Sequence, residues 1–354
     1  MTDFSTITAC GECCVGCPKK LDGRCPGCIE ADGRVPEWTE SGRCRVHSCT
    51  RDHDVQFCGL CAAFPCAKLP SLISWNPDIV EKMTALRNEY FLNRSIKRMK
   101  DRIVRILDNH VHSFWLYGSV VLDDFRPGWS DIDILVLSDA QITEQQAQQF
   151  VGLRQAMLEA EPDNPYYRSF EGVIADRNEY LTGSFSRLVY WGTSGERITN
   201  RYQKDVFSSY ELAKYGRSVC GDNDRSIFAV PSAAELRSAV KQHYESIRRY
   251  AVQTDEKLYS CGWLLDIARC IYTLRYNSVI AKTKAGSWAL KEHLFTDEEP
   301  LKRTLEIRQN PAAYKDREDI KQWLKNLGPV VQQYADVLEQ ELNLSEPEQT
   351  SRPG

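Results

Sequence analysis

The chain has 354 residues, with 45 lysines and arginines against 49 aspartates and glutamates, and a formal net charge of −4. This length predicts two or three domains, and the small negative charge gives no basic surface for nucleic acid. No apolar run approaches the length of a membrane helix. We therefore expect a cytoplasmic globular protein with neither nucleic-acid nor membrane partners.

Residues 1–70 are dominated by cysteine. Eleven of the fourteen cysteines lie at or before residue 66, and some of them form Cys-x2-Cys pairs. A two-residue gap lets two thiolates bind one tetrahedral metal ion, as in structural zinc sites. The first residues lack the basic start and apolar core of a signal peptide, so we expect reducing conditions that disfavour disulfides. We predict a Zn²⁺-binding module with ligands from Cys10, Cys14, Cys17, Cys25, Cys28, Cys44, Cys49, Cys58, Cys61 and Cys66.

This block resembles a family of cysteine-rich bacterial domains of unknown function. The similarity rests on Cys14-x2-Cys17-Pro, Cys25-Pro-Gly-Cys28, Phe57-Cys-x2-Cys61 and Phe64-Pro-Cys66, together with Cys10-Gly. Ten matching cysteines suffice for two four-ligand sites with two thiols left over, or for sites completed by His47 or His53. An iron–sulfur cluster is the alternative, but cysteine pairs spread through turns favour zinc.

A helix is expected from Asp78 to Leu107, because its apolar residues recur at helical spacing. Capping boxes at Thr143–Gln146 and Ser232–Glu235 predict two further helix starts. Nearly all of the chain after Pro231 shows helical periodicity. The segment after Leu344 is rich in Glu, Pro and Ser, so we expect a disordered tail.

Two acidic residues and a Gly-Ser turn carry the chemistry of the middle segment. An apolar strand ends at Gly118-Ser119, and a second apolar strand carries Asp131 and Asp133. Residues two apart on a strand share one face, and two close carboxylates are typical ligands for Mg²⁺. A glycine turn lets backbone N–H groups approach a phosphate. The pattern predicts transfer of a nucleotide from a triphosphate.

These residues resemble the signature of the polymerase-beta-like nucleotidyltransferase superfamily. The resemblance implies that Asp131 and Asp133 hold Mg²⁺ and that the Gly-Ser turn, with Ser130, binds the nucleotide. It also implies a third carboxylate on a later strand. Glu171, between apolar neighbours, fits that place and would act as the general base. Its alternative is an exposed glutamate at a sheet edge.

The C-terminal part resembles the helical domain of the aminoglycoside (streptomycin/spectinomycin) adenylyltransferases. The similarity rests on Ile267-Ala-Arg-Cys-Ile271 and Lys282-Thr-Lys-Ala-Gly-Ser-Trp288. It implies that Arg269, Lys282 and Tyr314 contact the triphosphate of ATP. The acidic residue that holds a cationic acceptor in this family has no clean counterpart, although Asp255 or Glu256 could serve.

We therefore expect an α/β nucleotidyltransferase domain and an α-helical C-terminal bundle, preceded by the cysteine-rich module. The expected bounds are 1–70 for the module, 71–94 for a helical linker, 95–204 for the catalytic domain, 205–344 for the helical domain and 345–354 for the tail. The expected reaction is Mg²⁺-dependent adenylyl transfer from ATP to a small-molecule hydroxyl, with an aminoglycoside antibiotic as candidate. One alternative is a protein-modifying enzyme that adenylylates Tyr, Ser or Thr and whose cysteine-rich module recruits the protein partner. The other is a non-catalytic metal-binding adaptor.

Overall fold

The structure is a computed structural model that describes residues 2–36, 42–193 and 195–344. The chain divides into two compact units, Met1–Arg98 and Met99–Gly354. The long helix α4 (Ile79–Ile106) starts in the first unit and ends in the second, as its apolar spacing predicts. The tail expected to be disordered lies outside the described residues.

The first unit folds its cysteine-rich segment around a small apolar core. Phe57, Leu69, Ile73 and Met83 are almost fully buried in this core, and they come from both sides of residue 70. The cysteine-rich segment has few aliphatic side chains, so the first turns of α4 complete the core. The boundary expected at residue 70 thus divides residues that pack together. The unit also contains three short helices: α1 (Pro18–Leu21), α2 (Arg45–Asp52) and α3 (Leu69–Leu72).

The second unit contains a six-stranded sheet in the order β5-β4-β3-β2-β1-β6. Strands β2 and β3 run parallel, and the other neighbouring strands are antiparallel. The central strands are nearly continuous apolar runs, as expected where both faces of a sheet are covered. The strands are β1 (Val111–Tyr117), β2 (Ile132–Ser138), β3 (Phe170–Asp176), β4 (Leu188–Gly192), β5 (Gly195–Thr199) and β6 (Arg217–Gly221), and the helices among them are α5 (Glu144–Ala160), α6 (Arg177–Thr182) and α7 (Val206–Tyr215).

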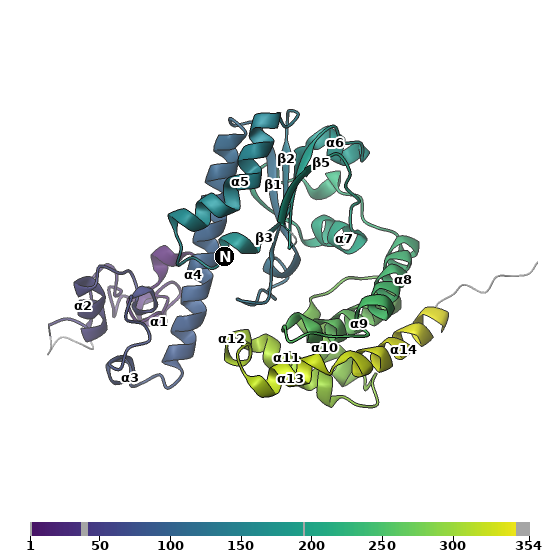
Figure 1. Ribbon diagram of the computed structural model, residues 1–354. Helices are drawn as coiled ribbons and strands as arrows, with labels where there is room; N and C mark the ends of the chain where they lie inside the picture. The colour runs from purple at the N-terminus through teal and green to yellow at the C-terminus, as the bar shows by residue number, and fades with distance from the viewer. Residues whose placement is uncertain (1, 37–41, 194, 345–354) are drawn as a thin grey trace, which may run out of the picture. The chain divides into compact units, whose positions relative to one another are not determined.

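Helices cover both faces of the sheet (Figure 1). Helix α5 lies on one face, where the indole N–H of Trp191 donates a hydrogen bond to the carbonyl of Phe150 at 3.0 Å. Helices α6 and α7 lie on the other, where Leu212 of α7 packs in a buried cluster with Leu135 of β2. Asp133 precedes Leu135 by two residues and therefore points to this second face.

Strand β6 lies beyond the boundary expected at residue 204. It pairs with β1, with Ser113 opposite Gly221, and so covers an edge that would otherwise be unpaired. Helix α7 also belongs with the sheet, because it packs against β1. The α/β part of the second unit therefore extends to Gly221.

A helical part follows (Figure 1). Leu264, Ile267 and Ile271 are fully buried in its core. The capping boxes predicted at Thr143–Gln146 and Ser232–Glu235 are confirmed. Within the described segments, no helix is both long and apolar enough to cross a bilayer. The helices are α8 (Ala233–Tyr250), α9 (Tyr259–Tyr276), α10 (Lys282–Lys291), α11 (Glu299–Gln309), α12 (Pro311–Tyr314), α13 (Glu318–Lys325) and α14 (Gly328–Leu344).

Candidate active site

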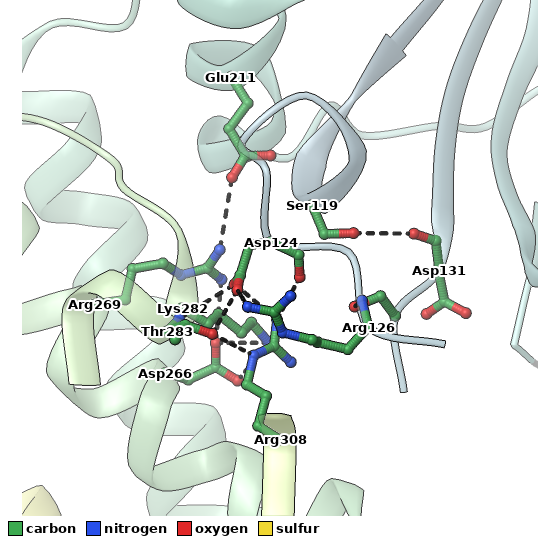
Figure 2. Close-up of polar contacts among 11 residues, drawn as sticks. Ser119, Asp124, Arg126, Asp131, Glu211, Asp266, Arg269, Lys282, Thr283 and Arg308 are labelled. Atoms are coloured by element: carbon green, nitrogen blue, oxygen red, sulfur yellow. Dashed lines mark hydrogen bonds and ion pairs between the residues drawn. The ribbon is translucent and has the colours of Figure 1, made fainter. Parts of the chain in front are cut away.

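The turn after β1 brings backbone close to the carboxylates. Gly118 adopts φ +66°, and a Cβ atom there would lie 2.0 Å from Oδ2 of Asp133. Only glycine fits a left-handed conformation with so near a neighbour. The hydroxyl of Ser119 donates to the carbonyl of Asp131 at 3.3 Å, as Figure 2 shows. The turn and the start of β2 are therefore held side by side.

Three carboxylates gather on the face of the sheet that α7 covers. Asp133 of β2 lies opposite Glu171 of β3 in the parallel register, and Asp131 directly precedes β2. Burial and the charge of Glu171 raise the pKa of Asp131 to about 6. Burial, followed by the charges of Glu211, Asp131 and Glu171, raises the pKa of Asp133 well above its ordinary value.

The chemistry of Asp131 and Asp133 suits a divalent cation, although no three ligating side chains of the described residues are placed around one. Burial and mutual repulsion both favour the protonated carboxyls, so a bound cation is what would keep Asp131 and Asp133 ionised together at neutral pH. Carboxylate oxygens are the ligands that Mg²⁺ prefers. The Oε1 atom of Glu171 accepts a hydrogen bond from the hydroxyl of Tyr190 at 3.1 Å, which orients this third carboxylate.

The helical part supplies two positively charged side chains to the site, Arg269 and Lys282. Asp266 of α9 accepts a hydrogen bond from Nη2 of Arg269 at 3.1 Å and pairs with Nζ of Lys282 at 3.0 Å. Glu211 of α7 lies 3.6 Å from Nη1 of Arg269. Burial raises the pKa of Glu211 to about 7, although Arg269 opposes this shift. The two cations are thus held in place by acidic neighbours before any ligand binds (Figure 2).

A cavity of about 840 Å³ lies between the carboxylates and the cations. Its walls include most of the residues predicted for the site: Gly118, Ser119, Ser130, Asp131, Asp133, Arg269 and Lys282. Glu171 lies next to this group but is not part of the cavity wall. Tyr314 is also outside the wall, since it packs partly buried against the helical core. Its predicted contact with the triphosphate stays a prediction.

Several cavity residues were missed by the sequence analysis. The sequence contained an indication of Asp266, because this residue precedes Arg269 by three positions and so lies on the same helix face. The indication of Glu211 was weaker: it is an acidic residue between Tyr210 and Leu212, which are both buried in α7. Both acids pair with the cations that the family resemblance assigned to the nucleotide.

The cavity continues beyond the charged groups toward the start of α9. Asp255 lines this end together with Tyr259 and Trp263, whereas Glu256 does not. The carboxylate of Asp255 accepts a hydrogen bond from the hydroxyl of Ser260 at 2.8 Å. Of the two acids considered for a cationic acceptor, Asp255 is therefore the one that faces the cavity.

The cysteines of the first unit are all free of disulfides. Among residues 2–36, 42–193 and 195–344, no three His, Cys, Asp or Glu side chains are placed so that they could hold a metal ion. The predicted zinc module is therefore not confirmed as a metal site.

Two family models match the chain on either side of the cavity. Residues 92–165, which include Asp131 and Asp133, match the nucleotidyltransferase domain. Residues 226–336, which include Arg269 and Lys282, match the aminoglycoside adenylyltransferase C-terminal domain. The chain is a nucleotidyltransferase. The aspartates and the two cations of the cavity thus come from the two matched segments, and Glu211 of α7 lies between these segments in the chain.

Among solved structures, this nucleotidyltransferase is similar to spectinomycin adenyltransferase AAD(9) from Enterococcus faecialis, crystallised with ATP and spectinomycin. The sequences are 17% identical, the TM-score is 0.50, and the match covers 70% of this chain and 99% of AAD(9). At this identity the similarity shows a shared fold. A comparison with curated proteins gives no match.

Proposed function

We propose that this nucleotidyltransferase transfers AMP from ATP to a hydroxyl group of a small cationic molecule of the aminoglycoside antibiotic class, in the cytosol and with Mg²⁺. The observation that carries the proposal is the single cavity in which Asp131 and Asp133 face Arg269 and Lys282. Carboxylates that fit a divalent cation, opposed by fixed cations, are what a triphosphate requires.

In this reaction an acceptor oxygen attacks the α-phosphorus of ATP, and the bond from that phosphorus to the bridging oxygen breaks to release pyrophosphate. Asp131 and Asp133 would hold Mg²⁺, which when bound neutralises phosphate charge. Ser119 and the adjacent backbone would bind phosphate oxygens. Arg269 and Lys282 would stabilise the charge that develops on the pyrophosphate, and Glu171 would accept the hydroxyl proton.

Antibiotic acceptors are supported by the match of residues 226–336 and by Asp255 at the far end of the cavity. Expression of the chain in a susceptible bacterium should raise the inhibitory concentration of spectinomycin or streptomycin, and the Asp133→Asn variant should not. Equal susceptibility with the active and inactive chains would rule out both drugs as acceptors. Adenylylated host proteins in the same cells would instead support a protein acceptor.

Replacing Glu171 with glutamine should leave ATP binding nearly unchanged and slow transfer. The amide keeps the size and the hydrogen bond with Tyr190 but cannot accept a proton, so we expect a loss of about 10²-fold or more in kcat. Calorimetry with ATP and Mg²⁺ and single-turnover kinetics measure the two effects. Lost ATP binding would instead place Glu171 among the metal ligands and leave the base unassigned.

We also propose that the cysteine-rich module binds zinc structurally. The support is that its thiols influence one another's ionisation in two separate groups, although no three of the described side chains are placed as ligands of one metal ion. Burial and the charges of Cys14, Cys10 and Cys44 raise the pKa of Cys28 to about 12. Burial and the charges of a second set, Cys66, Cys49 and Cys61, raise the pKa of Cys58 to about 11. Each group contains four thiols, the number that a closed tetrahedral zinc site uses.

Metal analysis of the purified protein should therefore find about two zinc ions per chain, and the protein should be colourless. Cys17→Ser, outside both groups, should keep this stoichiometry, whereas Cys28→Ser should lower it by one. A brown protein with the absorption of an iron–sulfur cluster would contradict zinc. A metal-free protein that folds normally would contradict a metal site altogether.

A further inference from the structure

A buried polar cluster joins the two walls of the cavity. Asp124 comes from the loop between the Gly118 turn and β2, Thr283 from the first turn of α10, and Arg308 from the last turn of α11. Asp124 is 3% exposed and Arg308 is 2% exposed. A buried ion pair costs desolvation energy. Its position beside the nucleotide cavity therefore suggests that it has a role there.

The cluster is fully connected. Nη2 of Arg308 donates to Oδ2 of Asp124 at 2.8 Å, and Nε of Arg308 donates to the hydroxyl of Thr283 at 2.9 Å. The backbone N–H of Thr283 donates to Oδ2 of Asp124 at 3.2 Å, and its hydroxyl donates to the same carboxylate. Burial opposes ionisation, but Arg308 and Thr283 hold the pKa of Asp124 below its ordinary value. Figure 2 shows the three side chains meeting.

Each end of the cluster leads directly to a residue of the proposed phosphate site. The backbone N–H of Asp124 donates to the carbonyl of Ser119 at 2.9 Å, which ties the loop to the turn. On the other side, Thr283 follows Lys282 at the start of α10. The guanidinium carbon of Arg308 also lies 5.4 Å from the ring centre of Trp129, next to Ser130. One carboxylate thus connects the phosphate turn with the lysine that faces it.

We propose that Asp124, Thr283 and Arg308 are positioning residues that fix the distance between Ser119 and Lys282, and hence align the triphosphate for transfer. This inference rests on the proposed function. The Asp124 and Arg308 side chains reach the cavity wall but are bound to each other, so they act through Ser119 and Lys282. Lys282 matters most when charge accumulates on pyrophosphate, so its displacement weakens the transition state more than bound ATP.

The mildest test removes only the Thr283 hydroxyl. Thr283→Val keeps the shape of the side chain, and Thr283→Ser keeps the hydroxyl. The assay uses streptomycin or spectinomycin, whichever is the better acceptor. Thr283→Val should lower kcat at least about tenfold and change the Kd of ATP with Mg²⁺ less than about threefold. Thr283→Ser should keep the wild-type kcat. A lowered melting temperature with unchanged kcat would show a purely structural role and overturn the proposal.

A double-mutant cycle tests whether the cluster acts through Lys282. In a Lys282→Ala background, Thr283→Val should change kcat by less than about twofold, because the group that it positions is gone. If Thr283→Val lowered kcat by the same factor with and without Lys282, the result would contradict the proposal. Glu196→Gln is a matched control, since it breaks the ion pair of Glu196 with Arg154 of α5, on the opposite face of the sheet, and should leave kcat unchanged. A wild-type protein without transfer activity would instead contradict the proposed function, and the positioning role with it.

Discussion

Asp133→Asn is expected to abolish nucleotidyl transfer and leave the fold intact. Asp133 is a proposed Mg²⁺ ligand, and stabilisation of phosphate charge by a metal is worth several kcal/mol, so we expect kcat to fall at least about 10²-fold. The fold should tolerate the change, because burial and neighbouring carboxylates already raise the pKa of Asp133 well above its ordinary value. The neutral amide removes that repulsion. Pyrophosphate release and thermal unfolding measure the two effects.

Asp131→Asn should behave in the same way, since burial and the charge of Glu171 raise the pKa of Asp131 to about 6. In a metal-free buffer above this pH, either variant should unfold at or above the wild-type temperature. A carboxyl whose folded pKa is raised destabilises the fold once it ionises. A variant that keeps more than about a tenth of the wild-type kcat, a loss of under ~1.4 kcal/mol, would show that its aspartate is not an essential metal ligand.

Gly118→Ala is the second substitution with a large expected effect. Its Cβ would lie 2.0 Å from Oδ2 of Asp133, so the aspartate or the turn must move. We expect kcat/KM to fall at least about tenfold, because displacement of either group misplaces the triphosphate. The left-handed backbone adds a stability cost of about 1–2 kcal/mol. Steady-state kinetics at saturating Mg²⁺, well below the unfolding temperature, separate the two effects.

Gly183→Ala provides the matched control. Gly183 adopts φ +76° at the end of α6, and no atom lies within 4 Å of the position of its Cβ. This variant should lose a similar amount of stability and keep wild-type kinetics. If both glycine variants lost stability but kept full activity, the close approach of the turn to Asp133 would have no role in transfer.

Local sequence patterns predicted the α/β core and one wall of the site. The Gly118 turn, Asp131 and Asp133 lie within sixteen residues of each other, so strand geometry alone places them together. Arg269 and Lys282 were found through family resemblance, and the structure brings them to the same cavity. Glu171 lies in register with Asp133 because β2 and β3 pair in parallel, which the sequence does not specify.

Contacts between distant segments were beyond the sequence patterns. Asp124 and Arg308 are separated by 184 positions, and each alone resembles an ordinary surface charge. Strand β6 was missed because its five residues are only partly buried and lack a continuous apolar run. Tyr314 of α12 packs partly buried against the helical core, and its contact with the triphosphate stays a prediction.

Adenylyl transfer to an antibiotic can be followed with labelled AMP. The full-length protein, Mg²⁺ and ATP labelled at the α-phosphate are incubated with spectinomycin or streptomycin, with Asp133→Asn as control, and the products are separated by mass. We expect label on the antibiotic and an equal amount of released pyrophosphate, both absent in the control. Label on protein would contradict a small-molecule acceptor, and no transfer from ATP to either drug or to protein would contradict the proposed reaction.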